Sequence, residues 1–307
     1  MDNYYETKQL KVDSIHTLKI KKFGNPKGIP VIFLHGGPGA PTDNDFSCYF
    51  DKRYFNIIVF DQRGCGTSTP LGELRNNNTH ELIEDIEKIR IICKFKKMVL
   101  FGGSWGASLA LLYMMKYPNN VISFIIRGAC LLKRNIFTES YKNMYPDKWE
   151  KFLSLGYSDN LAKTISKYFN KIKEKDRKYI ENWTDWELPC LTVFPEEDNS
   201  QMSYQDKYYY SLIESYYFKN NFFLPEDYIQ NNLKKIPNIP GYIVHGRLDV
   251  ICDPKDSYII SKAIEKSKLI FIESTGHNGE KMKKALIECT KKLIPIYFKS
   301  RNKYYIK

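Results

Sequence analysis

A serine, an aspartate and a histidine stand at three separated points of this 307-residue chain, each shortly after a predicted buried strand. The three strands are expected at residues 98–101, 242–245 and 268–272. A serine hydroxyl is a weak nucleophile at its free pKa, so it needs a base, most often a histidine oriented by a carboxylate. Open α/β sheets place their sites at the carboxyl ends of their strands. The pattern therefore predicts a triad in which Ser104 attacks, His277 is the base and Asp249 orients it.

The serine lies in a turn with little room for side chains. The pattern Gly-x-Ser-x-Gly spans residues 102–106, between a buried strand and an apolar helix expected at 108–115. Glycine on both sides lets strand and helix approach closely, so that the serine adopts a strained conformation with an exposed hydroxyl. Gly-rich turns around a serine also occur as ordinary loops, so the pattern alone leaves a structural role open.

A second glycine-rich stretch, His-Gly-Gly-Pro-Gly at 35–39, follows the strand expected at 31–34. Glycines at such a place free backbone N–H groups to point at a ligand, which is what an oxyanion hole requires. We expect the N–H groups of Gly37 and Trp105 to be its two donors. In the loop after the next strand, Asp61 and Arg63 are expected to form an ion pair that braces the loops beside the serine.

Other histidines compete with His277 for the role of base. His35 lies in the glycine-rich loop, where a structural role is expected, and His245 lies inside a strand. Taken alone, Asp249 could cap the following helix and His277 could be a surface residue. The order Ser, Asp, His favours the triad.

Strands and helices alternate along most of the chain. Strands are expected at 15–20, 31–34, 55–60, 98–101, 121–126, 242–245 and 268–272, and helices from 78 onward and at 108–115, 254–265 and 279–297. This rhythm predicts an α/β fold with a mostly parallel sheet and helices on both faces. It breaks between 131 and 237, where helices such as 206–218 follow one another without strands. We predict an inserted helical cap at 131–237 between two parts of the core, 1–130 and 238–307.

The composition argues against several classes of protein. The formal charge of +12 comes from lysines scattered in small groups, so no basic arm for nucleic acid is visible. The seven cysteines are odd in number and contain no C-x-x-C pair, which favours reduced thiols and no metal site. The sequence has no run of about 20 apolar residues, and we expect no secretory signal. We therefore expect a cytoplasmic protein without a membrane or nucleic-acid partner.

At this point the sequence resembles a known family, the proline iminopeptidases (prolyl aminopeptidases) of the α/β-hydrolase superfamily. The resemblance rests on Leu-His-Gly-Gly-Pro-Gly at 34–39, Asp-Gln-Arg-Gly-Cys-Gly-Thr-Ser at 61–68, Gly-Gly-Ser-Trp-Gly at 102–106, Gly-Arg-Leu-Asp at 246–249 and Gly-His at 276–277. Within the expected cap, Trp-Thr-Asp-Trp-Glu at 183–187 and Ile-Glu-Ser-Tyr-Tyr-Phe at 213–218 also resemble family segments. The resemblance implies release of an N-terminal proline from a small peptide, without metal or cofactor.

The resemblance also implies a binding site for the substrate amine. An exopeptidase holds a protonated amine, and a carboxylate supplies the opposite charge. In the family this acid lies in the segment that Glu214 matches, while Glu226 and Asp227 are nearby candidates for a second one.

The chain departs from the family pattern at four positions. Ser215 and Tyr216 replace an Asn-His pair, Leu248 replaces Tyr, and Asn278 replaces Ser. These changes leave the triad intact and bear on the preference for proline.

The sequence therefore predicts a serine exopeptidase that acts through a Ser-His-Asp triad and an acyl-enzyme. The alternative is an esterase or amidase that uses the same triad on a small non-peptide substrate. A non-catalytic binding protein of the same fold and a nucleic-acid binder are weaker alternatives. The sequence indicates no oligomeric state.

Overall fold

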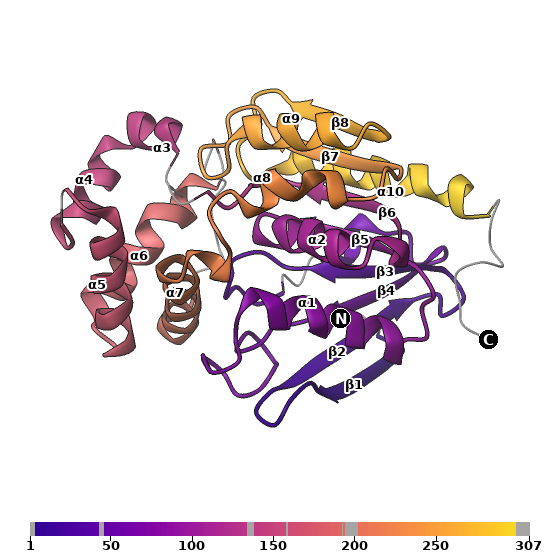
Figure 1. Ribbon diagram of the computed structural model, residues 1–307, viewed down its shortest axis with the longest axis horizontal. Coiled ribbons are helices and arrows are strands. Elements are labelled where there is room, and N and C mark those ends of the chain that lie inside the picture. Colours follow the sequence, from indigo (N-terminus) through magenta and orange to yellow (C-terminus); the bar gives the residue numbers. More distant parts are fainter. Residues whose placement is uncertain are drawn as a thin grey trace.

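The computed structural model describes residues 4–42, 46–133, 138–157, 159–191, 193 and 202–298. These residues form one central sheet flanked by helices, with a further group of helices beyond one side of it (Figure 1). The strands are β1 (Glu6–Lys11), β2 (Thr17–Gly24), β3 (Ile29–Leu34), β4 (Phe55–Phe60), β5 (Met98–Gly103), β6 (Val121–Arg127), β7 (Gly241–Gly246) and β8 (Ser267–Ile272). The helices outside the β6–β7 connection are α1 (Thr79–Ile92), α2 (Trp105–Lys116), α9 (Pro254–Ala263) and α10 (Glu280–Phe298). The helices within that connection are α3 (Glu139–Met144), α4 (Pro146–Ser154), α5 (Leu161–Lys173), α6 (Arg177–Glu187), α7 (Tyr204–Lys219) and α8 (Tyr228–Asn232).

The strand order in the sheet is β1-β2-β4-β3-β5-β6-β7-β8. From β4 to β8 every neighbouring pair is parallel, whereas β2 is antiparallel to both β1 and β4. The expected mostly parallel sheet is confirmed. The sequence did not predict β1, because this edge strand is polar and half exposed and lacks the apolar run of the inner strands.

Alternate residues of the inner strands face two separate hydrophobic clusters. In β3, Ile32 and Leu34 pack in the cluster that contains α1, α2 and α9, whereas Val31 and Phe33 pack in the one that contains α10. Successive side chains of a strand point to opposite faces of its sheet. Because both faces are covered, the inner strands are apolar almost throughout, and the expectation of helices on both faces is confirmed.

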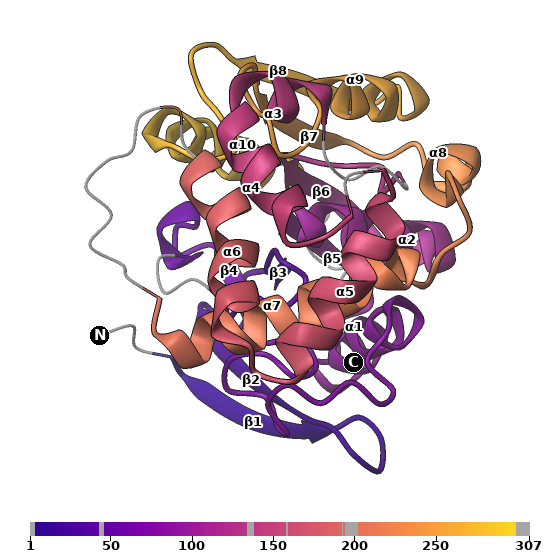
Figure 2. The same ribbon diagram turned by 90° about the vertical axis from the view of Figure 1, so that its left-hand side faces the viewer.

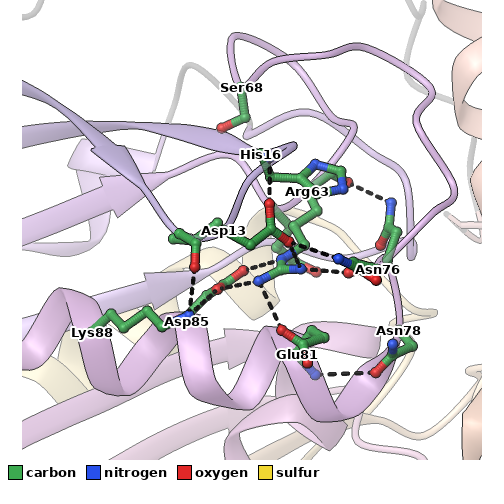
Figure 3. A network of polar contacts seen from close by, with 12 residues as sticks. Asp13, His16, Arg63, Ser68, Asn76, Asn78, Glu81, Asp85 and Lys88 are labelled. Carbon is green, nitrogen blue, oxygen red and sulfur yellow. Dashed lines mark hydrogen bonds and ion pairs between the residues drawn. The ribbon is translucent and has the colours of Figure 1, made fainter.

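A buried arginine ties the loop after β4 to α1 (Figure 3). Arg63 donates from Nε and Nη2 to the carboxylate of Asp85 at 2.6 and 2.7 Å, and it pairs with Asp13 at 2.8 Å and Glu81 at 3.1 Å. Asp61 instead accepts the N–H of Thr67 at 2.7 Å and that of Thr42 at 2.8 Å.

The prediction of an ion pair between Asp61 and Arg63 is therefore wrong. Arg63 finds carboxylates on α1 and in the loop after β1, and Asp61 is occupied by loop N–H groups. The start of α1 agrees with the prediction, since Asn78 Oδ1 accepts the N–H of Glu81 at 3.1 Å and caps the helix.

Helices α3 to α7 pack around a third cluster, which is rich in aromatic residues. Seen from their side in Figure 2, they lie in front of the sheet. Trp183 is fully buried there, with its ring centroid 5.9 Å from Phe152 and 5.6 Å from Tyr168. Helix α7 contributes Leu212 to this cluster and Ile213 to the cluster on the sheet, so it lies between the two.

The predicted cap limits, 131–237, stay a prediction. Near their end, Ile229 and Leu233 pack in the same cluster as α2, beside the sheet. The sequence pattern did not separate this segment from the rest of the predicted cap, because α8 is a helix like the elements before it.

Other features expected from the composition concern thiols, metals and membranes. The seven cysteines are free thiols. In the part of the chain that the structure describes, no three His, Cys, Asp or Glu side chains are grouped to hold a metal ion. Within the same residues, every helix is too short or too polar to cross a bilayer.

Candidate active site

Ser104 occupies a strained turn between β5, which ends at Gly103, and α2, which begins at Trp105. Its φ is 56° and its ψ is −126°, a region that residues with a side chain rarely adopt. A Cβ on Gly106 would lie 2.1 Å from the carbonyl oxygen of Leu34, and one on Gly102 would lie 2.3 Å from that of Gly106. Only glycine fits at both places, so the close approach inferred from the sequence is present. Strain of this kind concentrates at functional sites.

Asp249 and His277 form a buried pair across two loops of the sheet's carboxyl edge. His277 Nδ1 lies 2.7 Å from Asp249 Oδ2, and each residue is only 2% exposed. Asp249 Oδ1 accepts the backbone N–H groups of Ile251 and Cys252, both at 2.9 Å. His245 Nε2 also approaches Oδ2, at 3.1 Å.

These partners set the charges of the pair. Burial would raise the pKa of Asp249, but the neighbouring His277 and the hydrogen bonds from His245 and His277 hold it below its ordinary value. Burial lowers the pKa of His277, although Asp249 opposes this shift. At neutral pH the pair is therefore an ionised carboxylate beside a neutral imidazole, the state a general base needs.

Arg127 and Gly128, at the end of β6, lie beside both halves of the expected triad. The Ser104 N–H donates to the carbonyl oxygen of Arg127 at 3.0 Å, and Arg127 Nη1 donates to that of His277 at 3.2 Å. A Cβ on Gly128 would lie 2.7 Å from His277 Cε1 and 3.5 Å from Asp249 Oδ2. The histidine ring therefore packs directly on glycine backbone, which fixes its plane.

Gln62 links the glycine-rich loop to the serine turn. Its side chain accepts the indole N–H of Trp105 at 2.8 Å and donates to the carbonyl oxygen of His35 at 2.9 Å. Its backbone N–H donates to His35 Nε2 at 2.8 Å, so that ring is held as a neutral acceptor and has the structural role expected of it. The two segments that carry Gly37 and Trp105 are thus fixed relative to each other.

A cavity of about 260 Å³ opens between the sheet edge and the helices above it. Gly37, Ser104 and Trp105 line one side of it, and Glu187 and Glu214 line it as well. The departures from the family pattern at Ser215 and Tyr216 are not among its described lining residues. Ser215 donates to the carbonyl oxygen of Leu212, and the Tyr216 ring packs on those of Phe169 and Phe223.

Glu187 and Glu214 form a buried carboxyl pair inside this cavity. The Tyr210 hydroxyl lies in hydrogen-bond contact with Glu187 and 3.1 Å from Glu214 Oε1, and Trp183 Nε1 donates to Glu214 Oε2 at 2.7 Å. Among the described residues, neither carboxyl forms an ion pair with lysine or arginine. Tyr210 has one proton for two carboxyl acceptors, so it can donate fully to only one of them.

Burial controls the protonation of these two acids. It raises the pKa of Glu187 to about 7 and that of Glu214 well above its ordinary value, where the charge of Glu187 raises it further. Two like charges this close do not ionise together readily. A cation entering the cavity would stabilise the ionised forms.

The sequence did not identify Glu187 as the second acid. Its candidates Glu226 and Asp227 line a different hollow, which Glu214 does not reach. Glu187 ends α6 and Glu214 lies on α7, so only the packing of these helices brings the acids together. The one available signal was that Glu187 closes the Trp-Thr-Asp-Trp-Glu stretch that already resembled a family segment.

Comparison with known proteins places this chain in a family. The model of the family described as the alpha/beta hydrolase fold matches residues 29–279, which is most of the chain. The chain therefore belongs to the α/β hydrolases, in agreement with its sheet and the turn at Ser104. An esterase from Rhodococcus sp. ECU1013 has a similar fold, with a TM-score of 0.66 at 16% identity over 94% of this chain and 98% of the esterase.

Curated relatives narrow the family further. A probable proline iminopeptidase of Leptolyngbya boryana is 35% identical over 94% of this chain and 94% of that protein. A proline iminopeptidase of Arabidopsis thaliana is 36% identical over 90% of this chain and 76% of that protein. Within the α/β hydrolases, this chain is a member of the proline iminopeptidase family, and it is an enzyme of the hydrolase class.

Proposed function

We propose that this protein is a serine exopeptidase that releases an N-terminal proline from small peptides. The observation that carries the proposal is the pair of buried carboxyl groups, Glu187 and Glu214, in the same cavity as Ser104. The names of the curated relatives support the same activity.

The carboxyl pair suits a substrate with a free amine. A protonated N-terminal amine is positively charged and can pair with Glu187 and Glu214. Its N–H groups can donate to the carboxylate oxygens. Bound there, the amine would place the first carbonyl carbon of the peptide toward Ser104. Trp186, Phe218 and Phe222 line the same cavity and offer apolar surface to a proline ring.

The proposed chemistry follows from the charges of the buried pair. Neutral His277, oriented by ionised Asp249, takes the proton of the Ser104 hydroxyl as its oxygen attacks the carbonyl carbon. The N–H groups of Gly37 and Trp105 stabilise the oxyanion. His277 then protonates the leaving amine, and the same base activates water, which hydrolyses the acyl-enzyme.

Four substrates and one variant test this function. Hydrolysis is measured with Pro-β-naphthylamide, Ala-β-naphthylamide, N-acetyl-Pro-β-naphthylamide and p-nitrophenyl acetate, in the wild type and in Ser104→Ala. We expect strong preference for free proline, loss of activity on the acetylated substrate, and a loss of several orders of magnitude in the variant.

Other outcomes identify the alternatives. Turnover of the acetate alone would establish an esterase and refute the exopeptidase. Near-normal turnover by Ser104→Ala would refute the serine mechanism. Failure of a fluorophosphonate to label Ser104 in the wild type would favour a non-catalytic binding protein. The expected cytoplasmic location stays a prediction.

A further inference from the structure

A second histidine lies directly against the carboxylate of Asp249. His245, in β7, is fully buried, and its Nε2 lies 3.1 Å from Asp249 Oδ2 and 3.0 Å from the carbonyl oxygen of Cys252. Its Nδ1 lies 2.6 Å from the hydroxyl of Ser257 in α9. The ring thus connects the first turns of α9 to the proposed triad.

The partners of this ring fix the position of one proton. Nε2 faces a carboxylate and a carbonyl, which only accept hydrogen bonds, so Nε2 carries a hydrogen. Ser257 can either donate to Nδ1 or accept from it. The Nε2 hydrogen therefore faces both Asp249 Oδ2 and the carbonyl oxygen of Cys252.

With this contact, all of the described hydrogen bonds to Asp249 come from N–H donors. Oδ1 accepts two backbone N–H groups and Oδ2 accepts the N–H of His277, while His245 Nε2, which lies 3.0 Å from the carbonyl oxygen of Cys252, also lies 3.1 Å from Oδ2. A carboxylate surrounded by N–H groups is held in one orientation, and its affinity for a proton falls. The carboxylate in turn binds the N–H of His277 less strongly than a carboxylate that had lost one donor.

We propose that His245 is a positioning residue for the triad, which acts through Asp249 to orient His277. This inference rests on the proposed function of Ser104, Asp249 and His277. His245 is fully buried in β7 and contacts the triad through Asp249.

Several other groups act on the same pair. Arg127 of β6 donates to the backbone of His277, and its charge lowers the pKa of that residue. Glu187 of α6 interacts with the charge of Asp249, as does the thiol of Cys252 in the loop before α9. None of these groups donates a side-chain hydrogen bond to Asp249 Oδ2, so the variants below isolate the contact from His245.

Two polar substitutions at the same position separate the two nitrogens of the ring. In His245→Gln the side-chain amide reaches the place of Nε2 and can still donate to Asp249. In His245→Asn the shorter amide reaches only the place of Nδ1, facing Ser257, and leaves Asp249 Oδ2 with one donor.

The measurement is the rate of Ser104 labelling by a fluorophosphonate across the pH range. This reagent has no free amine, so the profile reports the enzyme alone. For His245→Asn we expect the acidic limb to move upward by about one pH unit, since one charged hydrogen bond is lost. The direction follows because a more basic Asp249 raises the pKa of His277, which must be neutral to act. For His245→Gln we expect the wild-type profile.

Steady-state kinetics with Pro-β-naphthylamide provide a second measurement. We expect kcat to fall in His245→Asn with KM unchanged, because the substrate pocket is untouched. Ser257→Ala is the matched control, since it removes a hydrogen bond from the same ring but leaves the contact with Asp249.

The outcomes separate this inference from the proposed function. If the wild type is not labelled at Ser104, the proposed mechanism fails. If the wild type is labelled and His245→Asn lowers only Tm, with the pH profile unmoved, His245 has a merely structural role and the inference is overturned. If neither variant folds, the wild-type ¹⁵N resonances of His245 decide: they should shift as His277 takes up its proton, and constant resonances would overturn the inference.

Discussion

The proposed site contains two groups of buried carboxyls, and they have opposite charge states. Asp249 is surrounded by N–H donors and is ionised, with its pKa below the ordinary value. Glu187 and Glu214 are as deeply buried but share two neutral donors, Tyr210 and Trp183, and their pKa values are raised. Burial is therefore not what decides the charge.

The number of donors explains the difference. Desolvation disfavours a carboxylate at both places, and it is offset only where hydrogen bonds and an adjacent imidazole favour the charged form. The Asp249 site is complete without a ligand. The Glu187–Glu214 site becomes complete when a cation enters, which is why we assign it to substrate binding.

The largest expected effect comes from removing the charge of Asp249 while keeping its shape. In Asp249→Asn the amide NH₂ must face either the two backbone N–H groups or the two imidazole rings. On either side the amide hydrogens would point at N–H groups that are themselves donors. His277 is then pushed into the wrong tautomer, and kcat should fall by roughly 10⁴-fold, as for other triads. Turnover of Pro-β-naphthylamide measures the loss.

A second buried aspartate provides the matched control. Asp85 pairs with Arg63 (Figure 3) and is not among the described residues that line the cavity. Asp85→Asn should lower Tm, because Arg63 loses an ionic partner, and leave kcat unchanged. If both variants lost activity equally, the comparison between a catalytic and a structural carboxylate would fail.

The next effect separates amine binding from catalysis. Glu214→Gln and Glu187→Gln should each reduce kcat/KM for Pro-β-naphthylamide by roughly 10²- to 10³-fold, because the bound ammonium loses a charged partner. Fluorophosphonate labelling of Ser104 should stay close to wild type. Glu226→Gln changes an exposed acid that does not line the cavity and should have no effect. Equal losses in labelling and turnover would show that the acids support the triad rather than the amine.

The sequence predicted the parts of this site that depend on local patterns. Apolar runs predicted the inner strands, and the glycine spacing predicted a strained turn at Ser104, whose φ the structure shows to be positive. The pairing of Asp249 with His277 followed from the order of strand ends, since parallel strands bring their carboxyl ends to one edge.

What the sequence missed depends on contacts between distant segments. Glu187 reaches Glu214 only because α6 and α7 pack together, and no periodicity links the two positions. His245 was set aside as a strand residue, yet the loop after β7 folds back and places Asp249 on its ring. The sequence analysis paired Arg63 with Asp61, the acid two residues away. In the structure Arg63 pairs with Asp85 of α1.

A smaller effect concerns the pH dependence of the two carboxyl groups. Amine binding needs an ionised carboxylate in the pair, so kcat/KM for Pro-β-naphthylamide should fall as pH drops through about 7, the pKa of Glu187. Labelling of Ser104 needs only neutral His277, whose pKa lies below its ordinary value. The acidic limb for labelling should therefore lie at lower pH than the limb for turnover. Coincident limbs would show that one group controls both.

The smallest effect is on stability, and its sign distinguishes the acid pair from Asp249. The folded-state pKa of Glu187 is raised from 4.5 to about 7, so its contribution to stability is complete below pH 4.5 and is lost as pH rises through 7. Glu187→Gln cannot ionise, so Tm of this variant relative to wild type should rise between pH 5 and pH 8, where the wild type loses most of that contribution. Asp249 has a lowered pKa and loses its contribution only in acid, so it does not affect this range. Glu226→Gln should leave the wild-type slope unchanged, and an unchanged slope in Glu187→Gln would mean that Glu187 is ionised in the free enzyme.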